Sequence, residues 1–110
     1  MKYNNTKINI GGTTYNVEFV DHIDTDDDDT VVNGLCDSSN NLITIATKLD
    51  DGRDMDDYDI EKNLWHEVIH GILNEGQYME ESDNEQLVEW LARCIWVVAH
   101  PNASKLKNQK

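Results

Sequence analysis

The segment 65–71, WHEVIHG, holds two histidines four positions apart, with a glutamate directly after the first. On an α-helix, which turns about 100° per residue, His66 and His70 lie roughly 40° apart and one turn from each other. Both imidazoles can therefore reach one ion, and Glu67 projects near enough to touch a water molecule on that ion. The spacing predicts a zinc site with its own general base, and the alternative is two ordinary histidines on one helix.

A catalytic zinc ion usually takes three protein ligands and a water molecule, so two histidines need a further partner. A second helical segment, otherwise almost entirely apolar, carries one stripe of other residues: Glu85, Glu89, Arg93 and Trp96. Both glutamates have ordinary alternatives, because Ser82 and Glu85 have the spacing of a capping box and Glu89 is placed for an ion pair with Arg93. Neither alternative explains the glutamates and the histidines together, so this stripe is the expected source of the third ligand.

The helix that carries the motif is predicted over 59–75. Asp59 is a good N-cap, Gly76 ends the helix, and the apolar residues between them form one face: Ile60, Leu64, Trp65, Val68, Ile69, Ile72 and Leu73. The second helix is predicted over 82–100, where Pro101 ends it. Because this helix is apolar almost all round, we expect it to be largely buried.

Residues 1–50 are predicted to form strands and acidic loops. Alternating apolar and polar residues predict strands in four places: 6–10, 13–20, around 31–36 and within 40–49. The first two flank Gly11-Gly12 and make a hairpin, whereas the Asp-rich segment 24–30 is too charged to bury. The expected fold is a single α+β domain over 1–100, in which an antiparallel or mixed sheet of three to four strands packs on the two helices. A polar tail follows over 101–110.

The composition limits the classes of partner. The 110 residues include 9 Lys and Arg against 22 Asp and Glu, a formal net charge of −13, which argues against nucleic acids and anionic membranes and favours a basic protein surface or a cation. No segment has the apolar length of a signal peptide or a transmembrane helix, so a cytoplasmic protein is expected. Cys36 and Cys94 are predicted to be free thiols and not metal ligands, since no CxxC or CxxH spacing occurs.

HEVIH, followed fifteen positions later by the first glutamate of NEQLVE (84–89), resembles the gluzincin class of zinc metallopeptidases. The chain is also similar to small ImmA/IrrE-like and SprT-like metalloprotease-domain proteins of bacteria and phages. The resemblance covers about residues 33–100 and is strongest at 64–71. It implies a minimal zincin-like fold, in which the strand at 41–47 would be the edge strand that pairs with an extended substrate.

The resemblance also implies a role for each matching residue. His66, His70 and Glu85 would bind zinc, and Glu67 would be the general base. Glu89 would orient a histidine, or replace Glu85 as ligand if the helix cap occupies Glu85. For the residue that stabilises the oxyanion, the sequence offers three candidates without preferring one: Tyr78, Arg93 and His100.

The first functional hypothesis is therefore a zinc-dependent peptidase that hydrolyses a peptide or protein substrate. A second is an acidic binding protein of a phage or mobile element, which would mimic DNA by presenting carboxylates to a basic, DNA-binding surface. A third keeps the zinc but gives it a purely structural role between the two helices.

Overall fold

The computed structural model describes residues 3–25 and 31–102. Four strands come first and three helices follow: β1 (Thr6–Ile10), β2 (Thr13–Val20), β3 (Gly34–Asp37), β4 (Leu42–Ala46), α1 (Asp57–Glu75), α2 (Met79–Ser82) and α3 (Glu85–Ala99). The architecture is an α+β fold with a mixed four-stranded sheet, which confirms the predicted fold class. Most of the predicted acidic loop and polar tail lies outside the described residues.

The sheet begins with the predicted hairpin. Gly11 and Gly12 both have positive φ, +61° and +97°, which is what a two-residue turn between twisted antiparallel strands requires. β2 then pairs in parallel with β4, and β4 pairs antiparallel with β3, giving the order β1-β2-β4-β3. The predicted strands at 6–10 and 13–20 are confirmed with these bounds.

The edge strand differs from the expectation. The strand expected at the edge, 41–47, corresponds to β4, which lies between β2 and β3. Ile43 and Ile45 are completely buried, as befits a strand with neighbours on both sides. β3, whose Leu35 and Asp37 are exposed, forms the edge of the sheet on that side.

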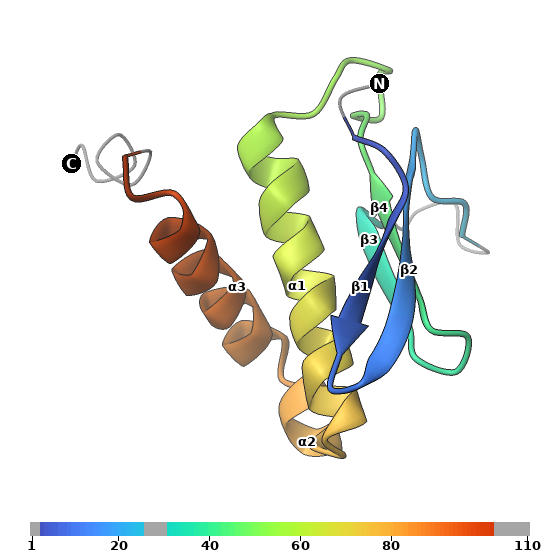
Figure 1. Cartoon of the computed structure of the whole chain (residues 1–110). Coiled ribbons are helices and arrows are strands. Elements are labelled where there is room, and N and C mark those ends of the chain that lie inside the picture. The colour runs from blue at the N-terminus through green and yellow to red at the C-terminus, as the bar shows by residue number, and fades with distance from the viewer. Residues whose placement is uncertain (1–2, 26–30, 103–110) are drawn as a thin grey trace.

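The elements form three layers, with the sheet on one side, α1 in the middle and α3 beyond it (Figure 1). The larger core lies between the sheet and α1 and consists of these residues: Ile10, Tyr15, Val17, Ile43, Ile45, Met55, Ile60 and Val68. A smaller cluster of Ile69, Val88 and Ala92 joins α1 to α3. Trp65 packs against both clusters. α1 is thus covered on two sides.

The helix boundaries correct two predictions. α1 begins at Asp57, two residues before the predicted start, and its N-cap is Asp56 and not Asp59. The helix predicted over 82–100 begins later, at Glu85, because the side chain of Asn84 accepts a hydrogen bond from the backbone N–H of Leu87 and caps α3, whereas Ser82 is the last residue of the short helix α2.

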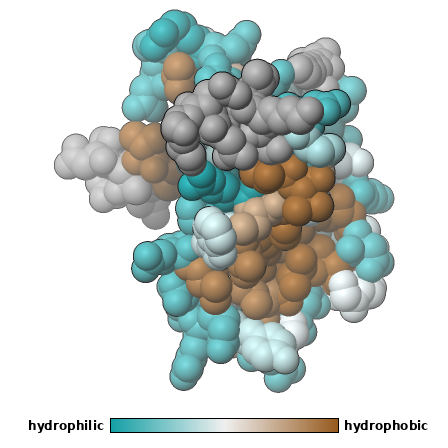
Figure 2. Space-filling view, turned by 90° about the vertical axis from the view of Figure 1, so that its left-hand side faces the viewer, coloured by the Kyte–Doolittle hydropathy of each residue, from teal (hydrophilic) through white to brown (hydrophobic). Residues whose placement is uncertain are grey.

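α3 is not buried all round as expected. It buries Val88, Ala92 and Trp96 against α1, but Trp90 and Val98 are 59% and 79% exposed. Figure 2, which views the side of the molecule where α3 lies, shows a continuous hydrophobic patch. None of the helices formed by the described residues is long and apolar enough to cross a membrane.

Candidate metal centre

Packing between α1 and α3 brings the candidate ligands together. His66, Glu67 and His70 lie in the middle of α1, and Glu85 and Glu89 lie in the first two turns of α3. Ile69 precedes His70 directly, and Val88 precedes Glu89 directly, so the apolar contact between the helices also sets carboxylates opposite imidazoles. The cluster that stabilises the fold therefore positions the site.

Three donor atoms meet at this point. Oε1 of Glu85 lies 2.9 Å from Nε2 of His66 and 3.1 Å from Nε2 of His70, and the two Nε2 atoms are 3.3 Å apart. Among the described residues, His66, His70 and Glu85 are the group whose ligand atoms converge closely enough to hold a metal ion. A tetrahedral zinc ion with bonds of about 2.1 Å separates its ligands by roughly 3.4 Å, so the three atoms need to move apart by only a few tenths of an ångström.

The other nitrogen of each ring is also occupied. Nδ1–H of His66 donates to Oε1 of Glu89 (2.9 Å), since a carboxylate can only accept, and Nδ1 of His70 hydrogen-bonds to the hydroxyl of Ser82 (3.0 Å). Because Glu85 is also a carboxylate, its Oε1 accepts a hydrogen bond from a protonated Nε2 where no metal ion is bound. Neutral imidazoles with hydrogen on Nδ1 would instead direct both Nε2 lone pairs to the point beside Oε1 of Glu85, and two such nitrogens with one carboxylate oxygen are a donor set that fits a zinc ion.

Glu89 is held as a carboxylate beside His66. Its Oε2 accepts a hydrogen bond and ion pair from Lys62 at 2.5 Å. Burial raises the pKa of Glu89, but the hydrogen bonds from Lys62 and His66 outweigh this, and the net pKa lies below the usual range. The structure thus places Glu85 beside both Nε2 atoms, and Glu89 where it can orient His66.

Glu67 is a buried carboxylate in the same cleft, with only 8% of its surface exposed. Burial raises its pKa above the ordinary value of a glutamate, while the neighbouring His66 and His70 act in the opposite direction. The backbone of β3 passes directly over it: a methyl group on Gly34 would lie 2.9 Å from Oε2 of Glu67. A raised pKa makes this carboxylate a stronger base towards the proton of a nearby water molecule.

The cleft itself has a volume of about 670 Å³. One wall consists of β3 and the preceding residues 31–33, and the other consists of α1, α2 and the start of α3. Exposed apolar side chains, Val31, Leu35 and Met79, line it beside the carboxylates of Asp83, Glu85 and Glu89. A chain segment that enters this cleft would lie between an edge strand and the three donor atoms.

The three candidates for oxyanion stabilisation lie elsewhere. The ring of Tyr78 is 59% exposed and lies against Gly76, and Arg93 borders a hollow on the outer side of α3. His100 stacks on Trp96 and its Nε2 lies 3.2 Å from Glu61. None of the three is among the described residues that line the cleft, whereas the side-chain amides of Asn63 and Asn74 do line it.

Sequence reasoning missed three further residues of the site, namely Ser82, Lys62 and Gly34. Ser82 was considered only as a helix cap, but it hydrogen-bonds to His70, and Glu89 pairs with Lys62 and His66 instead of Arg93. The position of Lys62, four residues before His66 on the same helix, was a signal that could have been used. No local signal places Gly34 or Ser82 in the site, because each depends on how distant segments pack.

Comparisons with protein-family models, curated proteins and solved structures give no match for this chain.

Proposed function

We propose that this chain is a zinc-dependent peptidase, with His66, His70 and Glu85 as the metal ligands. The observation that carries the proposal is the convergence of their three donor atoms, 2.9 to 3.3 Å apart, in an open cleft. Two imidazoles and one carboxylate are the ligand set of several catalytic zinc sites, which keep a fourth position for water or substrate. The spacing HExxH and the downstream Glu85 agree with the gluzincin pattern.

The chemistry follows from the position of Glu67. A bound zinc ion acidifies water and polarises a peptide carbonyl. Glu67 accepts the proton of the attacking water at its carboxylate and passes it to the nitrogen of the departing amine. Glu89 and Ser82 hold the two imidazoles through Nδ1, which keeps both Nε2 lone pairs directed at the same point.

The substrate is an extended and positively charged peptide segment. β3 is an edge strand beside the cleft, so its free backbone groups can pair with an extended chain. Lysine and arginine side chains suit the carboxylate of Asp83 at the cleft wall and the net charge of −13. The amides of Asn63 and Asn74 are the uncharged donors available to the carbonyl oxygen in the cleft.

A purely structural zinc is the second candidate, because the same three ligands join α1 to α3. A structural site needs no base, however, and structural zinc is usually enclosed by four protein ligands. Here Glu67 is buried beside the donor atoms and the cleft is open, so hydrolysis is favoured.

The experiment compares wild type with Glu67→Gln and with Glu80→Gln, an exposed carboxylate on α2 that does not line the cleft. Each protein is loaded with zinc and incubated with a peptide library that contains basic, neutral and acidic members, and cleavage is followed by mass spectrometry. We expect Glu67→Gln to keep its zinc and to lose about 100-fold or more in rate, since general-base catalysis contributes about 10²–10⁴-fold. Glu80→Gln should cleave as wild type does.

Two results would count against the proposal. Stable zinc binding without cleavage of any peptide by wild type would favour the structural role. Cleavage that Glu67→Gln leaves unchanged would remove Glu67 from the reaction.

A further inference from the structure

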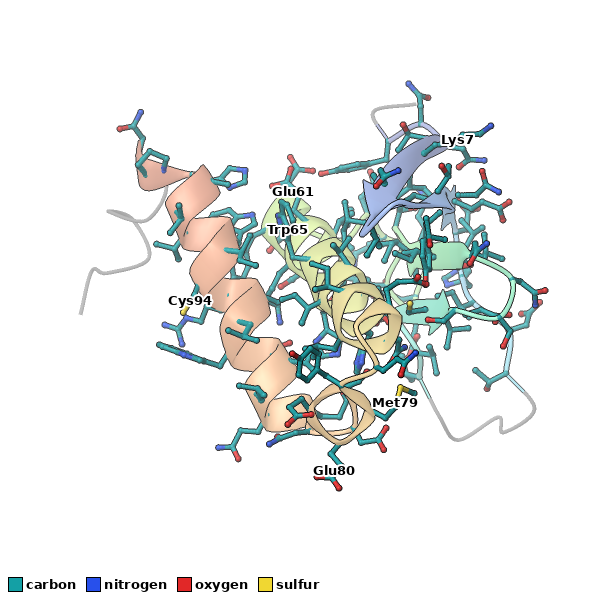
Figure 3. The ribbon with its side chains drawn as sticks, turned by 60° about the horizontal axis from the view of Figure 1, so that its bottom comes forward. Lys7, Glu61, Trp65, Met79, Glu80 and Cys94 are labelled. Atoms are coloured by element: carbon teal, nitrogen blue, oxygen red, sulfur yellow. The ribbon has the colours of Figure 1, made fainter. Side chains whose placement is uncertain are left out.

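The outward face of α3 carries apolar side chains, of which Trp90 and Val98 are exposed and Leu87 and Cys94 are half-buried in the part of the chain that the structure describes. Leu87, Trp90, Cys94 and Val98 fall within about 80° of the helix circumference, on the side away from the buried Val88, Ala92 and Trp96. We call these four residues the α3 stripe. Figure 3 shows Cys94 projecting from α3 away from α1, and Figure 2 shows the hydrophobic patch on this side of the molecule. An exposed apolar stripe of this kind marks an interaction surface.

The charge of this region differs from that of the rest of the chain. Between Gln86 and Ala99 the charged residues are Glu89 and Arg93, one negative and one positive, so this segment has no net charge. Glu89 faces α1, where Lys62 and His66 bind it. The whole chain carries −13. The four side chains of the α3 stripe are thus uncharged, and the charged residues that border the same hollow as Leu87 and Trp90, namely Glu89 and Arg93, have opposite signs.

We propose that the α3 stripe joins two copies of this chain in a homodimer. A basic partner would be attracted to the acidic surfaces and would gain little from an uncharged stripe, whereas another apolar stripe matches it. A two-fold axis brings the same patch of a second copy onto the first. Two molecules with a charge of −13 repel each other least when they meet through the face that lacks net charge. This inference does not depend on the zinc site or on peptide hydrolysis.

The size of the contact indicates a weak dimer. α3 has 15 residues and is about 22 Å long, and two such helices pack with their axes about 8–10 Å apart. A helix pair of this length buries at most about 1,000 Å² in total, which is below the standard interface and consistent with a micromolar dissociation constant. Cys94 lies near the middle of the stripe, so either direction of pairing places it close to Cys94 of the second copy.

The test is sedimentation of the full chain from about 5 μM to about 500 μM, a range that brackets micromolar dissociation constants. Wild type is compared with Val98→Glu and Trp90→Glu, which add a charge to the stripe. Thr14→Glu adds the same charge on the exposed face of β2 and is the control. Each protein is measured at about 0.05 M and about 0.5 M salt, between which the Debye length falls about threefold.

We expect wild type to form dimers that tighten at the higher salt, because screening reduces like-charge repulsion. Val98→Glu and Trp90→Glu should each weaken association at least about tenfold, and Thr14→Glu should not. In a Cys36→Ser background, a short bismaleimide should join two chains through Cys94. A monomer at every concentration and salt, a dimer that both stripe variants leave unchanged, or a concentrated dimer that resists cross-linking would overturn the proposal.

Discussion

Gly34 and Glu67 are in direct contact across the cleft, with the backbone of the edge strand β3 lying over the carboxylate on α1. A methyl group on Gly34 would lie 2.9 Å from Oε2 and 3.0 Å from Cγ of Glu67, closer than ordinary van der Waals contact. The absence of a side chain at position 34 therefore allows the Glu67 carboxylate to occupy its buried position. The strand that would bind substrate and the residue that would move the proton are held in one fixed arrangement.

Gly34→Ala is predicted to displace the Glu67 carboxylate without touching the three donor atoms. We expect peptide hydrolysis to fall by about 10- to 100-fold, because a small misplacement of a catalytic group has effects of this size. Zinc content should stay that of wild type. The matched control is Gly71→Ala on α1, whose new methyl would come as close as 2.9 Å to the end of the Ile10 side chain and would meet Cys36 and Tyr15 at ordinary van der Waals distance. Equal losses in the two variants, or loss of zinc from Gly34→Ala, would contradict the explanation.

The two glutamates of α3 are predicted to behave differently in zinc titrations. Glu85→Gln replaces the charged carboxylate donor with a neutral amide and should abolish stoichiometric zinc binding. Glu89→Gln keeps all three donor atoms but removes the carboxylate that holds Nδ1 of His66, and such partners contribute about 10- to 100-fold to metal affinity. Competition with a chromogenic chelator measures both affinities. If Glu89→Gln lost zinc and Glu85→Gln retained it, the assignments of the two residues would be exchanged.

The core between the sheet and α1 should dominate the stability of the fold. Ile43 on β4 is 0% exposed, and Ile43→Ala is expected to lower the free energy of unfolding by about 3 kcal/mol, through lost transfer energy and the cavity left behind. Val98→Ala, at a side chain that is 79% exposed, should change it by less than about 0.5 kcal/mol. Urea unfolding followed by tryptophan fluorescence measures both. If Val98→Ala lowered the free energy of unfolding as much as Ile43→Ala does, the Val98 side chain on α3 would be buried in the monomer.

The protein is predicted to lose stability at alkaline pH. Burial is the largest cause that raises the pKa of Tyr3, with hydrogen bonds to Asp57 and Glu61 adding to it, and burial also raises the pKa of Tyr15 and Cys36. Above the ordinary pKa values of these groups the unfolded chain loses protons that the folded chain retains, so the free energy of unfolding falls as pH rises.

Tyr3→Phe removes one of these groups and should make the decline above about pH 9 less steep. Its stability at neutral pH should fall modestly, because the hydrogen bond to Asp57 is lost. Unfolding free energies at several pH values distinguish the slope from this offset. An unchanged slope would show that Tyr3 does not contribute to the alkaline loss.

Local patterns were sufficient for the hairpin and for the main helix. The turn Gly11-Gly12 and the alternation on either side of it specify two strands, and the apolar period from Ile60 to Leu73 specifies α1. These signals depend on neighbours in the sequence. They do not predict the pairing of β2 with β4, because it joins segments more than twenty residues apart. This pairing makes β3 the edge strand of the sheet.

The site shows the same division between local and distant information. HExxH placed His66, Glu67 and His70 on one helix face, and the structure brings Glu85 to them. The role of Ser82 could not be predicted, because it depends on the turn after α1. In that turn Gln77 takes a positive φ, the backbone N–H of Tyr78 bonds to the carbonyl of Leu73, and the chain folds back into α2. The exposure of α3 likewise depends on having α1 on one side only.

The central claim is that His66, His70 and Glu85 hold a zinc ion. The most direct measurement is the zinc content of the wild-type protein by elemental mass spectrometry, after incubation with zinc and dialysis against metal-free buffer. The three converging donor atoms predict about one zinc ion per chain, and a His66→Ala variant treated in the same way should retain almost none. Wild-type protein that keeps no zinc, or a His66→Ala variant that keeps as much as wild type, would contradict the account.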